Sequence, residues 1–419
     1  KQYPFPGAAV LPRPEFAFPA LLWYNIIIYE PFGGMPMIAI VTDAHYRMSV
    51  ALIRDLAESG MQVIACERPQ FAKPVGFASR AAWQCYQLPE GDLAEGLLSL
   101  CREVAARCGE TPALLPVGAK TLAAVAARRA DFDAVCGLCI PTTRQLALLN
   151  DKAALHALAQ QLKIAVPQEY VPELGDSVQH FAARAPLPCA VKPVCGEQFD
   201  LPAAQRYAIA RTPRELEDAY ARFYALTNSA PIVQEYLPGA GLGCSVLTKN
   251  GEILACIAHR RVREYPASGG PSSCCRVIDD APLLALVRPL VRELALSGVA
   301  MFEFKCGADG QPRLLECNPR VWGTYPLTRA AGTNFTCLWA CAALARPLPP
   351  YCRPKPVKMV YYPADAAAML GYFRRGKLGR GLGFFADFLN PCVKNGLWQW
   401  RDPAPGLRYL AGLFRRSRP

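Results

Sequence analysis

At roughly 100–200 residues per domain, the 419-residue chain is long enough for about two to four domains and a large buried core. Apolar residues make up 52% of the chain and charged residues 19%, a balance that excludes an intrinsically disordered protein. The net charge of +12 at pH 7 is concentrated in residues 353–419, which hold 13 Lys or Arg and 3 Asp. No nucleic-acid recognition motif accompanies these charges, so we expect no specific nucleic-acid partner.

Residues 1–34 precede the first convincing domain, and we interpret them as an appended segment. Their apolar run over residues 16–29 has 14 residues and includes Pro19, whereas a membrane-spanning helix needs about 20 apolar residues. No dense basic region precedes this run and no small-residue cleavage site follows it, so it does not resemble a signal peptide.

Residues 35–140 predict an N-terminal α/β domain with a doubly wound parallel sheet. Apolar runs of strand length alternate with amphipathic patterns of helical period, which is typical of successive βαβ units. The loop after the first strand has no G-x-G-x-x-G motif, so a dinucleotide is not expected there. The expected elements are strands 37–43, 62–66 and 112–117 and helices 49–59 and 92–107.

Residues 141–350 predict a two-lobed α+β module. A helix follows Asn150-Asp151-Lys152 and extends to about Leu162. A small lobe over residues 187–240 contains a helix that opens with the capping box Thr212-Pro213-Arg214-Glu215. Asn250-Gly251 then predicts a tight hairpin in the larger lobe. The expected strands of the module are 188–193, 207–210, 231–236, 243–248, 252–259, 299–305 and 312–317.

The hairpin around Asp309-Gly310 is the most informative feature of the sequence. An even loop centred on these two residues pairs positions whose numbers sum to 619, which sets Glu303 directly opposite Glu316, about 5 Å apart at Cβ. Asn318, two residues further on, is expected on the same face. Two carboxylates and an amide oxygen suit Mg²⁺. The alternative is a pair of glutamates that point outward from a loose hairpin, but the neighbouring residues are strongly apolar.

Basic residues near these carboxylates could bind a polyphosphate. Lys152 opens a predicted helix, and Lys192 ends a strand that is otherwise apolar, where an unpaired charge is costly. Arg320 follows Asn318-Pro319 and could clamp a carboxylate or a phosphate. Further residues are candidates for substrate contact, but the arginines could instead form a solvated face and the other residues a plain loop. These candidates are Arg260, Arg261, Arg263, Ser268, Gly269, Gly270 and Ser272.

The order of these motifs resembles that of the ATP-grasp superfamily, over residues 37–345. The closest likeness is to the carboxylate-amine ligase-like branch, whose members show a similar His-Arg-Arg and then Gly-Gly-Pro-Ser stretch, here at residues 259–261 and 269–272. The motifs that carry the resemblance are Asn150-Asp151-Lys152, Ala190-Val191-Lys192-Pro193, Val233 to Gly239, Phe302-Glu303-Phe304-Lys305 and Leu315 to Arg320.

This resemblance implies ATP as cofactor with one or two Mg²⁺ ions, or Mn²⁺ in their place. Residues 35–140 would be the preATP-grasp domain and residues 141–350 the ATP-grasp module, with its small lobe as a flap over the nucleotide. The implied nucleotide contacts are Lys152 and Lys192 at the phosphates, Gln234, Glu235, Tyr236 and Leu237 around the adenosine, and Glu303. The implied metal ligands are Glu303, Glu316 and Asn318, and the implied catalytic side chains are Arg320, Arg261 and Lys192.

One departure concerns the flap after Lys192. Many relatives carry a run of glycines there, whereas residues 194–199 hold a single one, Gly196. Contact between backbone amides and phosphate is therefore less certain in this chain, and slower turnover by a less mobile flap would follow.

The resemblance implies a ligase that activates a small-molecule carboxylate as an acyl phosphate for attack by an amine, giving an amide or peptide-like bond with ADP and phosphate. Two alternatives use the same residues: a small-molecule kinase and a non-catalytic ATP-binding protein. His45, at the end of the first strand, could line the substrate cleft or serve a structural role. A homodimer is compatible with the sequence.

The last region, residues 351–419, is basic and rich in aromatic residues. Several interpretations of this region remain. It could form a solvated face, contact an acidic partner or an anionic substrate, or make a peripheral membrane contact. The chain has 18 cysteines, many of them inside predicted strands and helices, which is typical of a reducing, cytoplasmic environment. Cys136-x-x-Cys139 has no second pair nearby, so we interpret it as core packing and not as a zinc site.

Overall fold

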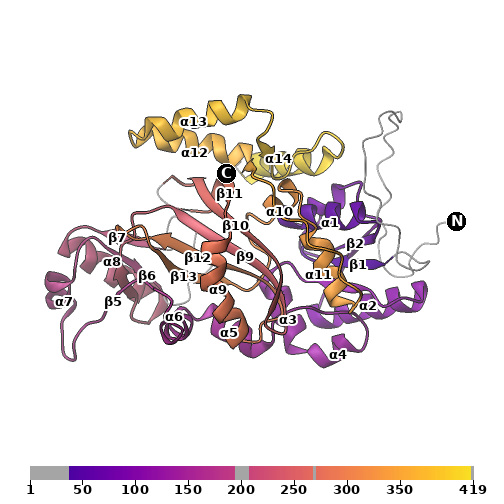
Figure 1. Cartoon of the computed structure of the whole chain (residues 1–419), viewed down its shortest axis with the longest axis horizontal. Coiled ribbons are helices and arrows are strands. Elements are labelled where there is room, and N and C mark those ends of the chain that lie inside the picture. Colours follow the sequence, from indigo (N-terminus) through magenta and orange to yellow (C-terminus); the bar gives the residue numbers. More distant parts are fainter. Residues whose placement is uncertain (1–36, 194–206, 268–269, 417–419) are drawn as a thin grey trace.

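The computed structural model describes residues 37–193, 207–267 and 270–416. Its strands form three sheets in this part of the chain. Figure 1 shows the N-terminal domain and a small lobe at opposite ends of the molecule, with a large antiparallel sheet between them and a pair of C-terminal helices above it. The appended segment and the flap at residues 194–199 lie outside the described residues.

The N-terminal domain confirms the expected parallel sheet, with strand order β3-β2-β1-β4. The first strand is completely buried, as its continuous apolar sequence predicts for a sheet covered on both faces. The strand at Gln84–Gln87 has no apolar run, so the sequence pattern did not reveal it. The elements are β1 (Ile38–Val41), α1 (Arg47–Glu58), β2 (Gln62–Glu67), a 3₁₀ turn (Gly76–Ala78), β3 (Gln84–Gln87), α2 (Leu93–Cys108), β4 (Ala113–Leu115), α3 (Ala119–Ala127) and α4 (Arg129–Asp133).

The small lobe is an antiparallel sheet of order β5-β8-β6-β7 covered by two helices. The predicted N-cap is present, because the Thr212 side chain accepts a hydrogen bond from the Glu215 amide at 3.2 Å, but the Glu215 carboxylate accepts from the Arg211 amide and so does not complete the predicted capping box. The lobe has a hydrophobic core of its own, which includes Phe181, Val191 and Phe223. Its elements are β5 (Glu169–Tyr170), α7 (Val178–Arg184), β6 (Cys189–Lys192), β7 (Ala208–Ala210), α8 (Pro213–Thr227) and β8 (Ile232–Glu235).

The central sheet has the order β13-β12-β9-β10-β11-β14-β15. Asn250 and Gly251 both have positive φ, 51° and 83°, and form the predicted two-residue turn between β9 and β10. The elements of the central sheet and its covering helices are α5 (Thr143–Asn150), α6 (Lys152–Gln161), β9 (Gly241–Lys249), β10 (Glu252–Glu264), β11 (Ser272–Ile278), α9 (Ala281–Glu293), β12 (Gly298–Cys306), β13 (Pro312–Asn318), α10 (Pro326–Ala330) and α11 (Phe335–Ala343).

The second hairpin pairs Glu303 with Glu316 as predicted, but its turn differs from the expected one. Cys306 pairs with Pro312, which leaves an odd loop of residues 307–311 and shifts the first pairs by one position. An extra residue, Leu315, then forms a β-bulge between the pairs Phe304–Leu314 and Glu303–Glu316 and restores the predicted register. The facing carboxylates therefore depend on the bulge as well as on the turn.

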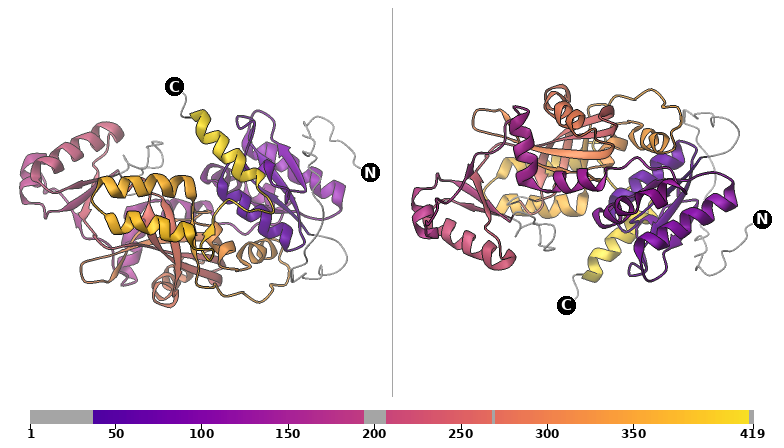
Figure 2. Two further views of the ribbon diagram at one scale, coloured as in Figure 1. Left: turned by 90° about the horizontal axis from the view of Figure 1, so that it is seen from above. Right: turned by 90° about the horizontal axis from the view of Figure 1, so that it is seen from below.

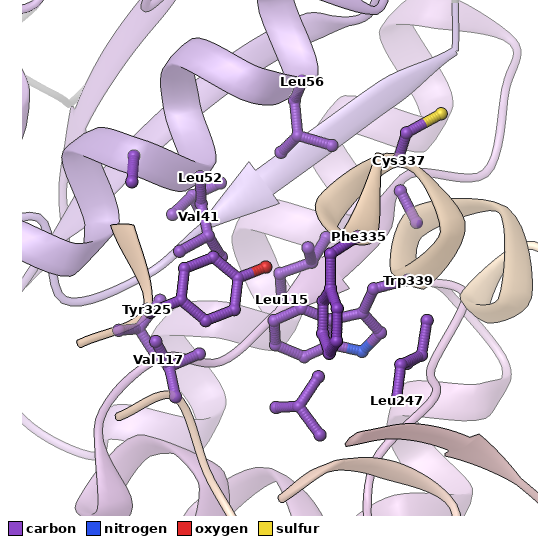
Figure 3. Close-up of a cluster of buried hydrophobic side chains, with 14 of the residues drawn as sticks. Val41, Leu52, Leu56, Leu115, Val117, Leu247, Tyr325, Phe335, Cys337 and Trp339 are labelled. Carbon is purple, nitrogen blue, oxygen red and sulfur yellow. The ribbon is translucent and has the colours of Figure 1, made fainter. Parts of the chain in front are cut away.

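The two faces of the central sheet pack against different partners. One face, with Val246, Ala300 and Phe302, packs on α5, α6 and α9. The other face joins the N-terminal domain in a shared core, in which Val41 and Leu115 of the parallel sheet meet Trp339 of α11 (Figure 3). The indole nitrogen of Trp339 donates a hydrogen bond to the Cys139 carbonyl at 2.8 Å. The N-terminal domain and the central sheet are thus one packed unit.

The C-terminal region folds back over the molecule and does not form a loose tail. Arg263 on β10 is buried against Asp365 and Asp387, with Nη2 to carboxylate distances of 2.7 and 2.8 Å. Arg54 of α1 donates to Asp402 through Nε at 2.9 Å. The elements are β14 (Lys358–Val360), α12 (Tyr362–Arg374), α13 (Leu378–Leu389), β15 (Lys394–Asn395) and α14 (Ala404–Arg416).

Within the described residues, no helix has both the length and the apolar character needed to cross a membrane. The cysteines in this part of the chain are free thiols, and many are buried. Cys136 and Cys139 both lie in hydrophobic cores, in agreement with their interpretation as packing residues.

Candidate nucleotide and metal site

The candidate site lies at one end of the face of the central sheet that carries the shared core. Side chains alternate between the two faces of a strand, so Val299, Met301, Glu303 and Lys305 of β12 share one face. Val299 and Met301 belong to the shared core. Glu303 comes next on the same face, so the charged site adjoins the junction with the N-terminal domain.

Each of the two facing carboxylates is paired with a cation. Arg261 of β10 donates from Nη2 to Glu303 Oε2 at 2.5 Å, and Lys152 Nζ lies 3.4 Å from Glu316 Oε2. Asn318 donates from Nδ2 to Glu303 Oε1 at 3.4 Å. Three predicted metal ligands, one predicted catalytic arginine and one predicted phosphate lysine are therefore brought together. Like charges at facing positions destabilise a sheet, and these cations offset that cost.

Burial raises the pKa of Glu303, although Arg261 acts in the opposite direction. Burial also acts to raise the pKa of Glu316, but the positive charges of Lys152, Lys192 and Arg261 outweigh it and the net shift is downward. The two carboxylates thus have different environments: the lysines gather around Glu316 and the arginine contacts Glu303.

The two lysines reach the site from different lobes. Lys152 is the first residue of α6, whose N-terminus is capped by the Asp151 side chain through the amides of Ala153 and Ala154 at 2.9 and 3.1 Å. Lys192 ends β6 of the small lobe. Burial and then the charge of Lys152 lower the pKa of Lys192 to about 7, while Glu316 acts to raise it. Two ammonium groups near one carboxylate are suited to a polyphosphate.

His259 is a neighbour of the site to which the sequence interpretation gave no role. Gly243 of β9 lies between Glu303 and His259 in the register of the sheet. A Cβ atom at Gly243 would meet His259 Cε1 at 2.3 Å, so the imidazole lies over this glycine. Burial, followed by the charge of Arg261, lowers the pKa of His259 to about 3, and its Nε2 lies 3.2 Å from Thr324 Oγ1. The sequence alone does not reveal this contact, because a regular register from the Asn250-Gly251 turn would pair His259 with Leu242, and the bulge between Ile253 and Ala255 moves the pairing to Gly243.

Arg320 connects the site with the N-terminal domain. Its Nη1 donates to the Val321 carbonyl at 3.1 Å, and its charge acts on the pKa values of both Glu303 and Tyr46. Tyr46 lies in the loop after β1. The neighbouring His45 lies 2.8 Å from Glu67 Oε2 through Nδ1 and stacks on Phe71. The carboxyl edge of the parallel sheet is therefore close to Arg320, where α/β sheets commonly bind ligands.

The predicted adenosine residues lie on β8 of the small lobe and just after it. Gln234 is buried, and its Oε1 atom has no hydrogen-bond partner among the described residues. The Glu235 carboxylate lies 3.4 Å from Arg313 Nε, while Lys305 Nζ lies 5.3 Å from the ring centroid of Tyr236. Leu237 is buried. A buried amide oxygen that lacks a donor fits a ligand bound beside this strand.

Several predicted substrate contacts do not point to the site. Arg261 pairs with Cys275 and Arg263 with Cys274, so a bulge between the two arginines turns them to opposite faces of the sheet. Arg260 is exposed and alternates with Arg261, and Ser272 donates to backbone carbonyls beside Arg263. Gly270 does approach the site, because its carbonyl accepts from Arg261 Nη1 at 3.4 Å. Ser268 and Gly269 lie outside the described residues.

The donor set fits a magnesium ion bound together with a nucleotide better than a metal held by protein alone. No group of three or more His, Cys, Asp or Glu side chains suited to a metal occurs in the described residues. Glu303, Glu316 and Asn318 provide oxygen atoms, and Mg²⁺ usually completes its coordination shell with water and phosphate oxygens. Glu303, Glu316 and Asn318 are thus the residues that would hold the ion.

The comparisons with known proteins agree with this geometry. Residues 227–362 match a family model described as ATP-grasp in the biosynthetic pathway with Ter operon. No curated protein sequence gives a match. Among solved structures, the chain is similar to the biotin carboxylase domain of 2-oxoglutarate carboxylase from Hydrogenobacter thermophilus, a dimer in complex with MgADP, ADP and bicarbonate, with a TM-score of 0.57, 16% identity and coverage of 77% of this chain and 72% of that one.

Two further solved structures have the same architecture. Biotin carboxylase from Campylobacter jejuni has a TM-score of 0.57 at 14% identity, covering 75% of this chain and 72% of that one. L-amino acid ligase from Bacillus licheniformis has a TM-score of 0.50 at 17% identity, covering 74% of each chain. The chain therefore has the ATP-grasp fold, which confirms the superfamily and the mixed α/β and α+β fold class predicted from its motifs.

Proposed function

We propose that the protein is an ATP-dependent ligase that activates a small-molecule carboxylate as an acyl phosphate and joins it to an amine. The observation that carries this proposal is the convergence of Glu303, Glu316 and Asn318 with Lys152 and Lys192 at the junction of the two lobes. Magnesium or manganese bound by the first three would neutralise phosphate charge there.

The residues of the chain have separate roles in this reaction. Lys152 and Lys192 bind the phosphates, while Gln234 to Leu237 hold the adenosine. A carboxylate oxygen of the substrate attacks the γ-phosphorus and ADP leaves. The amine nitrogen then attacks the acyl carbon, phosphate leaves and the nitrogen loses a proton. Arg261, which contacts Glu303, and Arg320, whose charge acts on Glu303, bind the acid or stabilise the transferred phosphoryl group.

Support for a ligase comes from two sides. The fold is that of proteins described as a biotin carboxylase and an L-amino acid ligase, although at 14–17% identity this likeness does not choose a substrate. The described residues of the site bring cations and carboxylates together, which suits phosphoryl transfer by positioning and charge neutralisation. We propose no particular acid or amine.

A screen of acid and amine pairs for dependent phosphate release tests this function. We expect Glu316→Ala to lower the rate by at least ~10²-fold, because it removes a metal ligand and the partner of Lys152. Glu252→Ala, at an exposed position on β10, is the matched control and should retain normal turnover. Near-normal turnover by Glu316→Ala would remove the metal assignment.

The products distinguish a ligase from a kinase on the same fold. A ligase requires both substrates and releases phosphate together with a new amide. ADP formation with the acid alone and a stable phosphorylated product would instead identify a kinase. Binding of MgATP without turnover in the whole screen would favour a non-catalytic ATP-binding protein.

A further inference from the structure

The helix α13 carries an apolar stripe that the other described residues leave exposed. Leu378, Leu382, Phe385 and Leu389 are 61%, 59%, 48% and 78% exposed. Their spacing of four, three and four residues aligns them along one side of the helix. Phe388 on the same helix and Leu370 on α12 add 59% and 52% exposed side chains. Such a continuous exposed apolar surface marks an interaction site.

The helix is held rigidly from its other side. Gly381 and Asp387 are its buried residues, and Lys358 of β14 lies 2.6 Å from the Asp387 carboxylate. The aromatic ring of Phe384 contacts that of Tyr362 on α12 at a centroid distance of 6.2 Å. Figures 1 and 2 show α12 and α13 side by side across the top of the molecule. The stripe is therefore presented on a formed helix and needs no ordering before it binds.

The exposed charges of the C-terminal region around this stripe have one sign. The only acidic residues after residue 352 are Asp365, Asp387 and Asp402, and all three are buried and paired with cations. The exposed charged residues next to α13 are basic at both of its ends: Arg374, Arg375, Lys377, Arg380 and Lys394. A hollow of about 490 Å³ at the turn between the two helices is lined by residues 376–380, which include two of these cations.

These observations favour one occupant of the surface. A second copy of the chain would bring basic residues against basic residues, which is repulsive. An acidic protein would match the charge. It would also need an apolar groove to cover the leucine and phenylalanine side chains that lie between the cations. A helix that presents leucine and phenylalanine between basic residues fits the headgroup region of a bilayer, with the apolar side chains below the surface and the cations at the phosphates.

We propose that α13 and the basic turn before it dock the protein on the surface of an anionic lipid membrane. The contact is peripheral and reversible. It is independent of the proposed chemistry, since none of the stripe residues belongs to the nucleotide site.

The test is sedimentation of the full chain with vesicles of pure phosphatidylcholine and vesicles that also contain phosphatidylglycerol. We expect binding to the anionic vesicles at least ~10-fold stronger than to the neutral ones, and release at high salt, because screening weakens the attraction. The double variant Leu382→Gln, Phe385→Gln should lose at least ~10-fold in binding to the anionic vesicles. Both positions are exposed, so its melting temperature should stay that of the wild type.

Matched controls separate the stripe from general surface effects. Leu174→Gln removes a fully exposed leucine of the small lobe and should bind like the wild type. The charge variant Arg374→Gln, Lys377→Gln should weaken binding, whereas Lys120→Gln, Arg214→Gln, at exposed positions elsewhere, should not.

Three results would overturn the proposal: equal sedimentation with neutral and anionic vesicles, unchanged binding of the stripe variant, or equal loss in the control variants. A dimer in solution that the stripe variant dissociates would also overturn it, and would identify a second copy of the chain as the occupant.

Discussion

Lys192 is the residue whose ionisation should respond most directly to the phosphate that we propose beside it. Its pKa is about 7, lowered first by burial and then by Lys152. The unfolded chain, with an ordinary lysine pKa of 10.5, binds more protons than the folded protein between pH 7 and 10.5. The contribution of this group to folding stability therefore becomes more favourable as the pH rises through that window.

Nucleotide binding should show the opposite dependence. Below pH 7 the ammonium is already formed and meets the phosphate, whereas above pH 7 the free protein must take up a proton on binding. We expect the Kd for MgATP to rise by up to ~10-fold per pH unit above pH 7. Calorimetric titration in buffers of different ionisation enthalpy measures this proton uptake.

Lys192→Met should bind the nucleotide more weakly and lose this pH dependence. Lys120→Met, at an exposed position on α3, is the control and should keep the wild-type profile. A wild-type Kd that stays constant from pH 7 to 9 would remove Lys192 from the phosphate site.

At the residue scale, sequence reasoning succeeded where a local rule applied. The facing of Glu303 and Glu316 followed from strand pairing, and an anionic neighbour for Lys192, here Glu316, followed from the cost of an unpaired buried charge. It did not anticipate the placement of Arg263. The bulge that turns Arg263 away from Arg261 has no signature in the sequence His-Arg-Arg-Val-Arg, whose regular alternation would give both arginines the same face.

At the scale of elements, β9 brings the site together because two of its residues have no side chain. Gly243 allows the imidazole of His259 to lie over the strand, and Gly241 makes room for Arg261, whose Cδ would lie 2.9 Å from an added Cβ. These glycines have ordinary strand geometry, so close approach and not backbone conformation explains them.

Gly243→Ala should therefore destabilise the protein. The added methyl group would overlap the His259 ring, and either the ring leaves Thr324 or the strands separate. We expect a loss of about 1–3 kcal/mol in the free energy of unfolding. Denaturant unfolding measures it.

Gly412→Ala provides the comparison, because nothing lies within 4 Å of a Cβ at that position of α14. It should be neutral or slightly stabilising, since alanine favours a helix over glycine. Equal stability of Gly243→Ala and the wild type would contradict the overlap argument.

In the hairpin of β12 and β13, the predicted pair Glu303–Glu316 is correct although the predicted turn is not. The predicted even loop was wrong, because the observed loop has an odd number of residues. The bulge at Leu315 compensates for this difference and restores the predicted pairing. The bulge also separates Leu314, in the core on one face, from Glu316 in the site on the other, although regular alternation would give them the same face. Turn type and bulge position depend on packing against α5 and α6, which the local sequence does not encode.

At the scale of the whole molecule, the C-terminal region clamps the N-terminal domain. Arg54 donates to Asp402 and also to the Leu397 carbonyl at 2.7 Å, while Ser79 donates to Asp402 at 2.6 Å. These partners are more than 300 residues apart in the chain, so no local pattern predicts them. The same holds for α12, α13 and α14, which the sequence interpretation described only as a basic aromatic region.

Asp402→Asn should destabilise the protein strongly. It leaves the buried Arg54 guanidinium without its counter-charge, which typically costs about 3–5 kcal/mol. We expect a clear fall in Tm, measured by thermal unfolding.

The exposed pair Arg102–Glu95 provides the control for this change. Glu95→Gln should lower Tm little, because surface ion pairs contribute little to stability. Equal effects of the two substitutions would show that the C-terminal clamp is not needed to hold the N-terminal domain.

The separate core of the small lobe has a consequence for motion. The N-terminal domain, the central sheet and the C-terminal helices share buried contacts, whereas Phe181, Val191 and Phe223 pack among themselves. Closing around a nucleotide would therefore move the small lobe against the larger unit that the other parts of the described chain form. In such a movement Lys192 would travel with the small lobe while Lys152 stayed on α6, so we expect the distance between their two ammonium groups to report whether the protein is open or closed.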